Sequence, residues 1–403
     1  MKRCSYSSSL HMKVKRRLTL LLVIFLFCIG ASGCWDRVEI DERAFVLGVA
    51  IDLVPPSESH IEPIPGQVPI RDNIYDMTVE IPIVSQMAGA EGGSSEKEPN
   101  WVISSTGADI TEISRTIMHR ANRFLFYGHQ KVLVIGEELA KEGIKPIIDF
   151  FDREPETNKR VKLIIAERDA KETLKITPKL SSAASLYIFE ILEHEHRSSR
   201  LIDSNIGRAL VSLRESGNAL LARVRASEEE VVVGGSAIIK DWKLVGWLGE
   251  IETRAAMFVM GEVRGGIITI QDPRAEGGKI SLEISSVKRI ITPYVEGDDV
   301  TFNIEVLIEG DITENTGPNL TVSRETVEIA QERIGVLVKE DIKSIISKVQ
   351  QEFKADFFLF SHLLAARRPH DWKRLESRWN EIFLKVKLNI DVRVRVRRFG
   401  VVR

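Results

Sequence analysis

The final strand-like segment places the strongest constraint on the fold of this chain. From Leu384 to Val396 every second residue is apolar, and the residues between them are Lys, Arg, Asn or Asp. A period of two puts the apolar side chains on one face of a β-strand and the polar side chains on the other. One face of this strand therefore lies on a core, and the other carries mainly positive charge.

The basic face has two interpretations. In the first, it is a stripe that binds anionic lipid or a protein partner. In the second, it is a solvated face whose cations pair with Glu305 and Glu309 on a neighbouring strand. We favour the ion pairs, because opposite charges across a sheet need no ligand to explain them.

The residues before this strand predict the rest of its sheet. ISLEISSVKRIITPYV and VTFNIEVLIEG are typical of two strands, and the apolar alternation in the first slips near Ser285 and Ser286. That slip predicts a β-bulge. In residues 324–350 apolar side chains recur every three or four positions, which indicates a long helix with one buried stripe.

A shorter helix carries Trp372 and Trp379, which are seven residues apart and so share one face. We expect both to pack on the sheet. Residues 279–403 are therefore predicted to form an antiparallel sheet covered by a long and a shorter helix.

The first part of the chain has a different pattern. The apolar run at 44–54 and the alternation at 75–83 indicate strands, the second of them half-buried. From residue 101 to 166 strand and helix alternate, and residues 168–215 are mainly helical. Residues 34–214 are thus predicted to form a mixed α/β domain.

A small middle domain is predicted at residues 215–278. Short β-type runs occur at 230–248 and 258–271, and glycine pairs interrupt them, as expected for a small sheet with tight turns. Turn-rich segments at 214–219 and 271–279 bound this region. The predicted fold class is α+β, with three consecutive mixed α/β domains.

The N-terminus has the pattern of a secretory signal peptide. Lys13, Lys15, Arg16 and Arg17 precede an apolar run from Leu18 to Ile29. As a helix that run would be about 18 Å long, whereas the hydrocarbon core of a bilayer is about 30 Å thick. It is too short to span, so residues 1–33 are predicted to be removed. Met12 is an alternative start, because residues 12–33 alone make a complete signal peptide.

Cys34 follows the small residues Ala31, Ser32 and Gly33. This arrangement resembles the bacterial lipobox, which implies that Cys34 receives a diacylglyceryl group and becomes the new N-terminus. Ala31 departs from the lipobox, which usually has Leu there. The alternative is an ordinary cleavage site followed by a free Cys34 thiol.

Composition excludes several classes of protein. The three cysteines are Cys4, Cys28 and Cys34, so cleavage before Cys34 leaves one and no disulfide framework. Residues 1–33 hold six of the 56 Lys and Arg residues and no Asp or Glu, so their removal changes the formal net charge from −2 to −8. That balance argues against a general nucleic-acid binder.

Catalytic and metal-binding motifs are absent, and we predict no catalytic residue, metal or cofactor. The sequence has no GxxxxGK[ST], HExxH or GxSxG. His194 and His196 are two residues apart, so on a helix they diverge instead of converging on a metal. We interpret His129 as hydrogen-bonded to nearby backbone. Asp152, Arg153 and Glu154 are interpreted as a helix-end charge cluster.

Several segments together resemble one family. They are CWDRVEIDERAFVLGVAID, FYGHQKVLVIGEELAKEGI, FFDREPETNKRVKLIIAERDAKETL, GGSAIIKDWKLVGWL, KVQQEFKADFFLFSHLLAARRPHDWKRLESRWNEIF and the closing strand. The chain resembles the Ger(x)C family of spore germination lipoproteins over nearly all of residues 34–398. One departure is ADFFLFS at 355–361, where the family usually has a glycine-bearing turn.

The resemblance implies a non-catalytic subunit of a nutrient germinant receptor. It implies a lipid anchor on the outer face of the spore inner membrane, and three mixed α/β domains in a row. The implied partners are a polytopic transporter-like receptor subunit and a second membrane subunit. Two other classes remain open, the substrate-binding lipoprotein of a transporter and a secreted cell-wall hydrolase.

Overall fold

The structure is a computed structural model that describes residues 16–21, 39–55, 74–83, 99–227, 230–316 and 323–399. The chain divides into two compact units, Met1–Arg43 and Ala44–Arg403. In the first unit, residues 16–21 are helical and Ile40–Glu42 form a short 3-10 helix. Cys34 and most of the predicted signal peptide lie outside the described residues.

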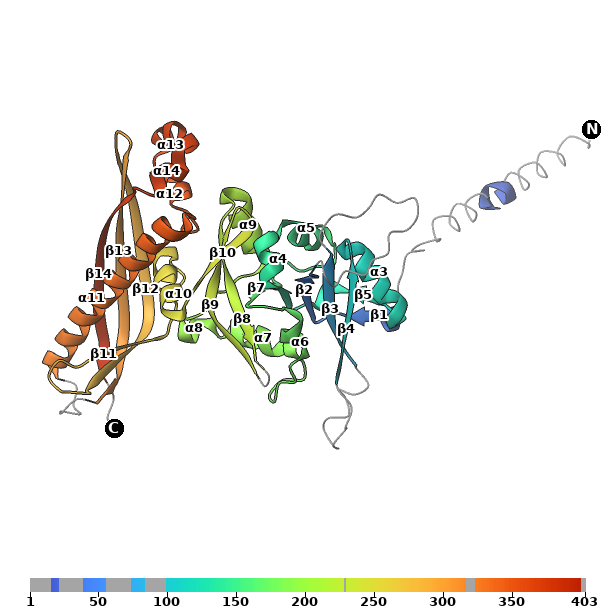
Figure 1. Ribbon diagram of the computed structural model, residues 1–403, viewed down its shortest axis with the longest axis horizontal. Helices are drawn as coiled ribbons and strands as arrows, with labels where there is room; N and C mark the ends of the chain where they lie inside the picture. The colour runs from blue at the N-terminus through green and yellow to red at the C-terminus, as the bar shows by residue number, and fades with distance from the viewer. Residues whose placement is uncertain are drawn as a thin grey trace, which may run out of the picture. The chain divides into compact units, whose positions relative to one another are not determined.

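An eight-stranded sheet forms the first large element of the second unit, in the order β10-β9-β8-β7-β6-β2-β3-β4 (Figure 1). Its strands are β2 (Gly48–Leu53), β3 (Tyr75–Pro82), β4 (Asn100–Gly107), β6 (Val132–Ile135), β7 (Lys162–Ala166), β8 (Ala219–Ala226), β9 (Val231–Lys240) and β10 (Lys243–Leu248). β2, β6, β7 and β8 are parallel, and the flanking pairs are antiparallel. A separate two-stranded sheet pairs β1 (Arg43–Phe45) with β5 (Phe124–Phe126), and a 3-10 turn, Tyr127–His129, follows β5.

Helices cover both faces of this sheet, as parallel strands with crossover connections require. One face packs against α3 (Ile110–Ala121), α4 (Glu137–Glu142), α5 (Lys145–Arg153) and α9 (Ile206–Ser216). The other face packs against α6 (Lys171–Lys175), α7 (Ala184–Glu193) and α10 (Glu250–Met260), and α8 (Glu195–Ser198) follows α7.

β3 is buried on both faces, whereas the sequence predicts a half-buried strand. Thr78 and Glu80 are buried as fully as Met77 and Val79 on the opposite face. The half-buried assignment was wrong because segments far along the chain, α6 and α7, cover the second face.

The predicted small sheet of residues 215–278 is not formed. β8 pairs with β7 across the predicted boundary at residue 214, so β8, β9 and β10 extend the first sheet. β11 (Ile267–Gln271) pairs with β12 of the second sheet instead. The division into domains 34–214, 215–278 and 279–403 otherwise stays a prediction.

Helix α10 corrects the β-type interpretation at the start of residues 258–271, where residues 258–260 are helical, whereas β11 confirms the predicted strand at the end of that range. It begins after Gly249, whose backbone N–H donates to the Glu252 carboxylate at 2.8 Å, and ends at Gly261 with φ of 75°. All seven residues from Thr253 to Val259 are buried. A helix enclosed on all sides has no amphipathic period, so the pattern that reveals surface helices is missing.

The second sheet has the order β11-β12-β13-β14, with β12 at Lys279–Glu296, β13 at Asp299–Asn315 and β14 at Lys387–Phe399. The predicted bulge is confirmed, since the register between β12 and β13 shifts between Ile284 and Ser286. The predicted alternation of the last strand is confirmed in β14. β14 runs parallel to β13, whereas the other pairs are antiparallel.

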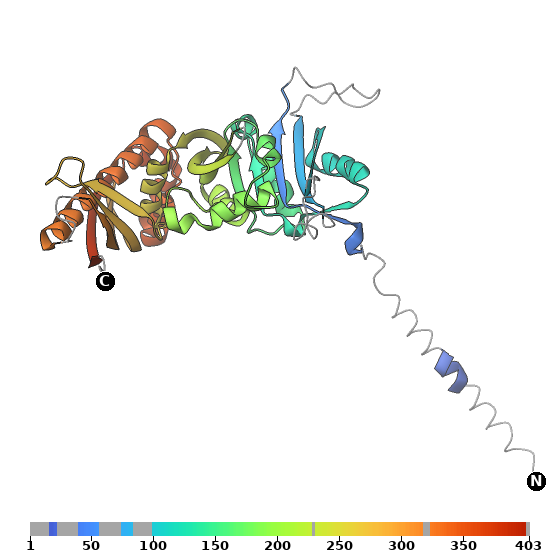
Figure 2. The same ribbon diagram turned by 90° about the horizontal axis from the view of Figure 1, so that it is seen from below.

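The parallel direction of β14 follows from its connection. Between β13 and β14 the chain forms α11 (Arg324–Lys348), a π-helical turn (Val349–Phe353), α12 (Phe360–Arg367), α13 (Pro369–Leu375), a 3-10 turn (Glu376–Arg378) and α14 (Trp379–Phe383). Such a crossover returns the chain to the end of the sheet where β13 began. α11 lies along one face of the sheet (Figures 1 and 2) and buries the predicted stripe, including Ala330, Ile334, Val338 and Ile342.

The predicted tryptophan helix is broken into α13 and α14. The Trp372 and Trp379 rings still meet edge to face, with centroids 5.5 Å apart. Trp379 is buried in the core that includes the sheet, and Trp372 packs against the same core.

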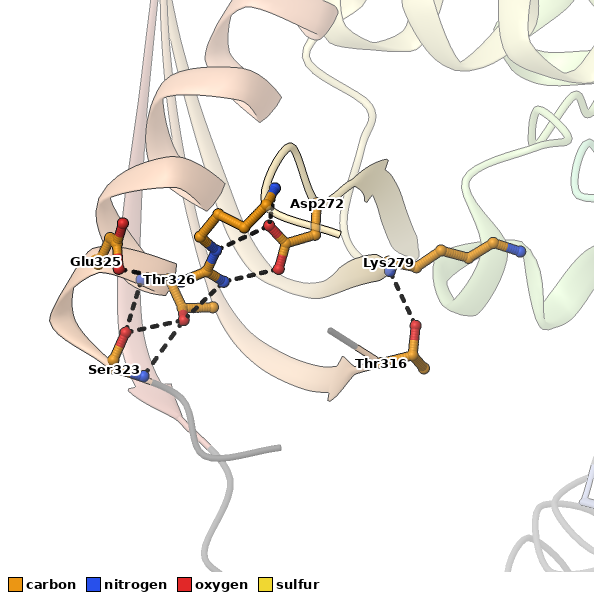
Figure 3. A network of polar contacts seen from close by, with 7 residues as sticks. Asp272, Lys279, Thr316, Ser323, Glu325 and Thr326 are labelled. Carbon is orange, nitrogen blue, oxygen red and sulfur yellow. Dashed lines mark hydrogen bonds and ion pairs between the residues drawn. The ribbon is translucent and has the colours of Figure 1, made fainter. Parts of the chain in front are cut away.

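A polar network joins the turn after β11 to the first turn of α11 (Figure 3). Arg274 donates to both oxygens of the buried Asp272, at 2.9 and 2.7 Å, and to Thr326 Oγ1 at 3.1 Å. Ser323 caps α11 by accepting from the Thr326 backbone N–H at 3.2 Å. The network therefore fixes where α11 begins.

Candidate functional site

The carboxyl edge of the parallel strands is the part of this sheet where a ligand site is expected. In open α/β sheets, ligands bind where neighbouring strands send their connections to opposite faces. Here the chain enters α4 on one face after β6, and enters α6 on the other face after β7. The crevice between the ends of β6 and β7 is therefore the candidate site.

Asp52, near the end of β2, occupies this crevice. Its Oδ1 accepts a hydrogen bond from the Ala170 backbone N–H at 2.6 Å, and its Oδ2 accepts from the Lys171 backbone N–H at 2.9 Å. These donors form the N-terminus of α6. A Cβ atom at Gly136 would lie 2.0 Å from Asp52 Oδ1, so the close approach requires glycine there.

Glu137 and Arg168 join the two loops that border the crevice. The Glu137 backbone N–H donates to the Arg168 carbonyl at 2.9 Å, and the Arg168 backbone N–H donates to Glu137 Oε2 at 3.1 Å. The backbone donors that hold a phosphate in nucleotide-binding folds are thus bonded to carboxylates of the chain itself. The arrangement suits a closed structural joint and leaves no open ligand crevice between these loops.

Glu80 of β3 makes an equivalent contact with α7. Its carboxylate accepts from the Ala184 and Ser185 backbone N–H groups, each at 2.9 Å, and from the Ser185 hydroxyl. Burial raises the pKa of Glu80, and burial raises the pKa of Asp52 to about 6. Both carboxylates accept hydrogen bonds from backbone N–H groups at the start of a helix, so they act as long-range N-caps that fix α6 and α7 on the sheet. Both are buried, with Asp52 6% and Glu80 1% exposed.

Sequence reasoning missed both carboxylates. The only local signal is a single acidic residue within an apolar strand, as in AFVLGVAIDLV and MTVEIPIV. Such a residue must either face solvent or find buried donors, and only the positions of α6 and α7 decide between the two.

The residues proposed from sequence are not brought together. The His129 side chain is exposed and lies beside Phe45 and Phe126, with ring centroids 5.1 and 5.7 Å away. His194 is exposed at the end of α7. Asp152 pairs with Lys159 at 2.6 Å and with Arg214, and the Lys159 hydrogen bond lowers the Asp152 pKa. The helix-end interpretation of Asp152 is confirmed.

The basic face of β14 is paired within its own sheet. Arg395 lies 3.6 Å from Glu309, and Arg397 also contacts Glu309. Arg393 lies 2.8 Å from Asp391 and 4.0 Å from Glu305. The predicted ion pairs with Glu305 and Glu309 are confirmed.

The described residues form neither a metal-binding cluster nor a membrane-spanning helix. Among them, no group of three or more His, Cys, Asp or Glu side chains is placed to hold a metal ion. In the same part of the chain, no helix is long and apolar enough to cross a membrane.

Comparison with known families gives two matches that together cover most of the chain. Residues 36–226 match the spore germination protein N-terminal domain. Residues 234–400 match the family described as spore germination B3/GerAC like, C-terminal.

Individual relatives match along the whole chain. Spore germination protein YndF of Bacillus subtilis is 27% identical over 404 residues, covering 97% of this chain and 99% of that protein. Spore germination protein B3 of the same organism is 25% identical over 388 residues, covering 94% and 97%. Among solved structures, the crystal structure of the GerBC protein matches with a TM-score of 0.57 and 22% identity, over 81% of this chain and 94% of that one. That structure supports the mixed α/β fold class.

Proposed function

This chain belongs to the Ger(x)C family of spore germination proteins, and from that membership we propose that it is a lipid-anchored, non-catalytic subunit of a nutrient germinant receptor. The observation that carries the proposal is the match of both family domains, at residues 36–226 and 234–400, in their natural order. The relatives match over nearly their full length, which supports a role for the whole chain.

The proposed anchor is a diacylglyceryl group on Cys34. A basic segment, a short apolar run and three small residues precede Cys34, as in other lipoprotein precursors. Two acyl chains hold a protein to a membrane far more firmly than one. The anchored chain would lie on the outer face of the spore inner membrane.

The proposed partners are the other subunits of the receptor, a polytopic transporter-like subunit and a second membrane subunit. The chain would bind them through its folded domains while the lipid keeps it at the membrane surface. No catalytic group is assigned in this proposal, which agrees with the structural roles of Asp52 and Glu80.

The test is to isolate the protein from spore membranes in mild detergent and identify what co-purifies with it. Two polytopic or membrane-bound partners in constant ratio are expected, together with slower nutrient-triggered germination when the chain is deleted. The proposal would be contradicted if the protein is isolated without any partner and its deletion leaves germination unchanged for every nutrient tested.

The difference in architecture between the two halves of the molecule argues against a substrate-binding lipoprotein of a transporter. Such proteins usually have two similar α/β lobes around a cleft. Here the first half is built on an eight-stranded mixed sheet and the second on a four-stranded sheet with helices on one face.

A further inference from the structure

One edge of the second sheet is open at β11 (Figure 1), and none of the roles above uses it. β11 pairs with β12 on one side, and within the described part of the chain no strand pairs with its other side. An open strand edge carries backbone donors and acceptors that another strand can use. The edge of β11 is therefore a candidate interaction surface.

The outward backbone groups of this edge include those of Thr269 and Gln271. The Ile284 N–H donates to the Gly266 carbonyl at 2.8 Å, so the backbone of Gly266 is directed toward β12. Backbone groups alternate in direction along an edge strand, so the odd-numbered residues of β11 are directed away from β12. An added strand would find the N–H and carbonyl groups of Thr269 and Gln271 on that side.

Helix α11 runs antiparallel to β11 beside this edge. Thr326, in the first turn of α11, accepts from Arg274 just after β11 ends (Figure 3). Farther along α11, Asp341 lies 3.9 Å from Arg254, and Arg254 donates to the carbonyl of Ile267 at the start of β11. A strand added to β11 would therefore lie along α11.

A groove of about 630 Å³ lies between α11 and β11, with room for several residues of a chain. Val336 and Leu337 give it an apolar floor, and Val336 is 57% exposed. Glu332 and Glu340 lie four residues before and after Val336, on the same stripe of the helix. Among the residues that the structure describes, neither glutamate forms an ion pair.

Arg333 also lines the groove, but its charge acts on a neighbouring carboxylate. The hydrogen bond from Arg274 lowers the pKa of Asp272, and the charge of Arg333 adds to this effect. Arg333 is thus partly balanced by Asp272. The negative charge of the groove comes from Glu332 and Glu340.

We propose that this groove binds an extended basic segment of a partner protein, which adds to β11 as a further strand. Its backbone would pair with Thr269 and Gln271, and every second side chain would face α11. Side chains on one face of a strand are about 6.6 Å apart, and residues four apart on a helix are about 6 Å apart. A segment with the pattern Lys-x-Val-x-Lys would therefore place its cations at Glu332 and Glu340 and its valine on Val336.

The charges favour such a segment over a second copy of this chain. β11 itself, IITIQ, carries no cation, and pairing the β11 edges of two copies would bring no charge of opposite sign to the glutamates. The cations of β14 point away from α11, because they pair with Glu305 and Glu309 on the face that α11 does not cover. The proposal goes beyond the receptor role proposed above and does not rest on it.

The test is titration of the full chain, in mild detergent, into the fluorescently labelled peptide acetyl-Thr-Lys-Thr-Val-Thr-Lys-Thr-amide, followed by fluorescence anisotropy. We expect saturable binding with a Kd below about 1 mM. The peptide with glutamate in place of each lysine should bind at least about tenfold more weakly. The double substitution Glu332→Lys and Glu340→Lys should reverse this preference.

Val336→Lys should weaken binding of the basic peptide by about tenfold or more, because it removes the apolar floor and adds a like charge. Val211→Lys is the matched control, since Val211 is also 57% exposed but lies on α9 outside the groove. Both variants should keep the melting temperature of the unaltered protein, because both positions are exposed.

Two N-methylated peptides test the strand pairing itself. In a strand the N–H groups of alternate residues point to opposite edges. One peptide carries N-methyl groups at its Lys and Val residues, and the other carries them at its Thr residues. Only one of the two should lose binding, because only one edge of the peptide meets β11.

Four results would each overturn the proposal. They are no binding of the basic peptide below about 1 mM, equal binding of the acidic peptide, normal binding by Val336→Lys, and an equal effect of the two N-methylated peptides. A dimer of the chain that Val336→Lys abolishes, with no binding of the basic peptide, would identify a second copy as the occupant instead.

Discussion

Replacing Asp356 with alanine should destabilise the second half of the molecule more than any surface change. The Asp356 carboxylate is buried between the turn before α12 and helix α14. It accepts from the Phe360 and Ser361 backbone N–H groups at 3.1 and 2.9 Å, and from Trp379 Nε1 at 3.0 Å. One side chain therefore caps α12 and orients the main aromatic residue of α14.

The turn at Asp356 also explains how the chain departs from its family pattern. Leu359, within the segment 355–361 that departs from the family pattern, adopts a left-handed backbone conformation with φ of 61°, and so does Lys354 just before that segment, with φ of 54°. Such conformations disfavour residues with a side chain. The hydrogen bonds to Asp356 help to hold the turn against that preference.

The magnitude follows from the donors left behind. A buried donor without a partner costs about 1–3 kcal/mol, and removing the cost of burying a carboxylate offsets part of the sum. We expect Asp356→Ala to lower the free energy of unfolding by about 3–5 kcal/mol. Trp379→Phe leaves the carboxylate its backbone donors from Phe360 and Ser361 and keeps an aromatic ring, so its cost should be about 1–2 kcal/mol.

The assay is urea unfolding of the two variants and the double variant, with the full chain in the same detergent. Because Asp356 and Trp379 share one hydrogen bond, the double variant should cost less than the sum of the single variants, by about 1 kcal/mol. Asp298→Asn is the control, since Asp298 pairs with Arg374 and Arg378 at an exposed position, where solvent screens the ion pairs, and it should destabilise the protein far less than Asp356→Ala. Strict additivity, or a cost for Asp356→Ala no larger than for the control, would refute the reasoning.

Three further predictions concern the N-terminus and the first sheet. Cys34→Ala should leave the fold intact but remove the proposed lipid, so that germination through this receptor weakens; mass spectrometry of the N-terminal peptide from spore membranes checks it, and an unmodified Cys34 thiol in the unaltered protein would exclude the anchor. The raised pKa of Asp52, about 6 against an ordinary 3.8, means that the folded state binds its proton more tightly, so this contribution to stability is complete below about pH 4 and is lost as pH rises through 6. The free energy of unfolding of Asp52→Asn, measured relative to that of the unaltered protein by urea unfolding, should therefore rise by up to about 3 kcal/mol between pH 4 and pH 8. A difference between the two proteins that does not change with pH would contradict this prediction. Gly136→Ala should cost about 2–4 kcal/mol, because its Cβ would overlap Asp52 Oδ1, whereas Gly277→Ala, where no atom lies within 4 Å, should cost no more than about 1–2 kcal/mol from its φ of 76°.

Where burial is one-sided, the sequence was sufficient to predict local structure. The sequence alone predicts the alternation in β14, the apolar stripe of α11 and the slip that marks the bulge at Ser285. The pairing of the β14 cations with Glu305 and Glu309 was predicted too, because charge at alternate positions needs a partner on the adjacent strand. The family resemblance was also carried by local motifs.

Only the tertiary structure decided what depends on contacts between distant segments. Helix α10 is enclosed along Thr253–Val259 and shows no amphipathic period, whereas β3 shows the alternation of a half-exposed strand although both of its faces are buried. The parallel direction of β14 depends on where α11 to α14 return the chain. Asp52 and Glu80 accept from backbone groups more than 100 positions away, and hydrogen bonds across such separations leave no local trace in the sequence. Periodicity reports which side of an element meets water, whereas the identity of the partner is set by the packing of the whole chain.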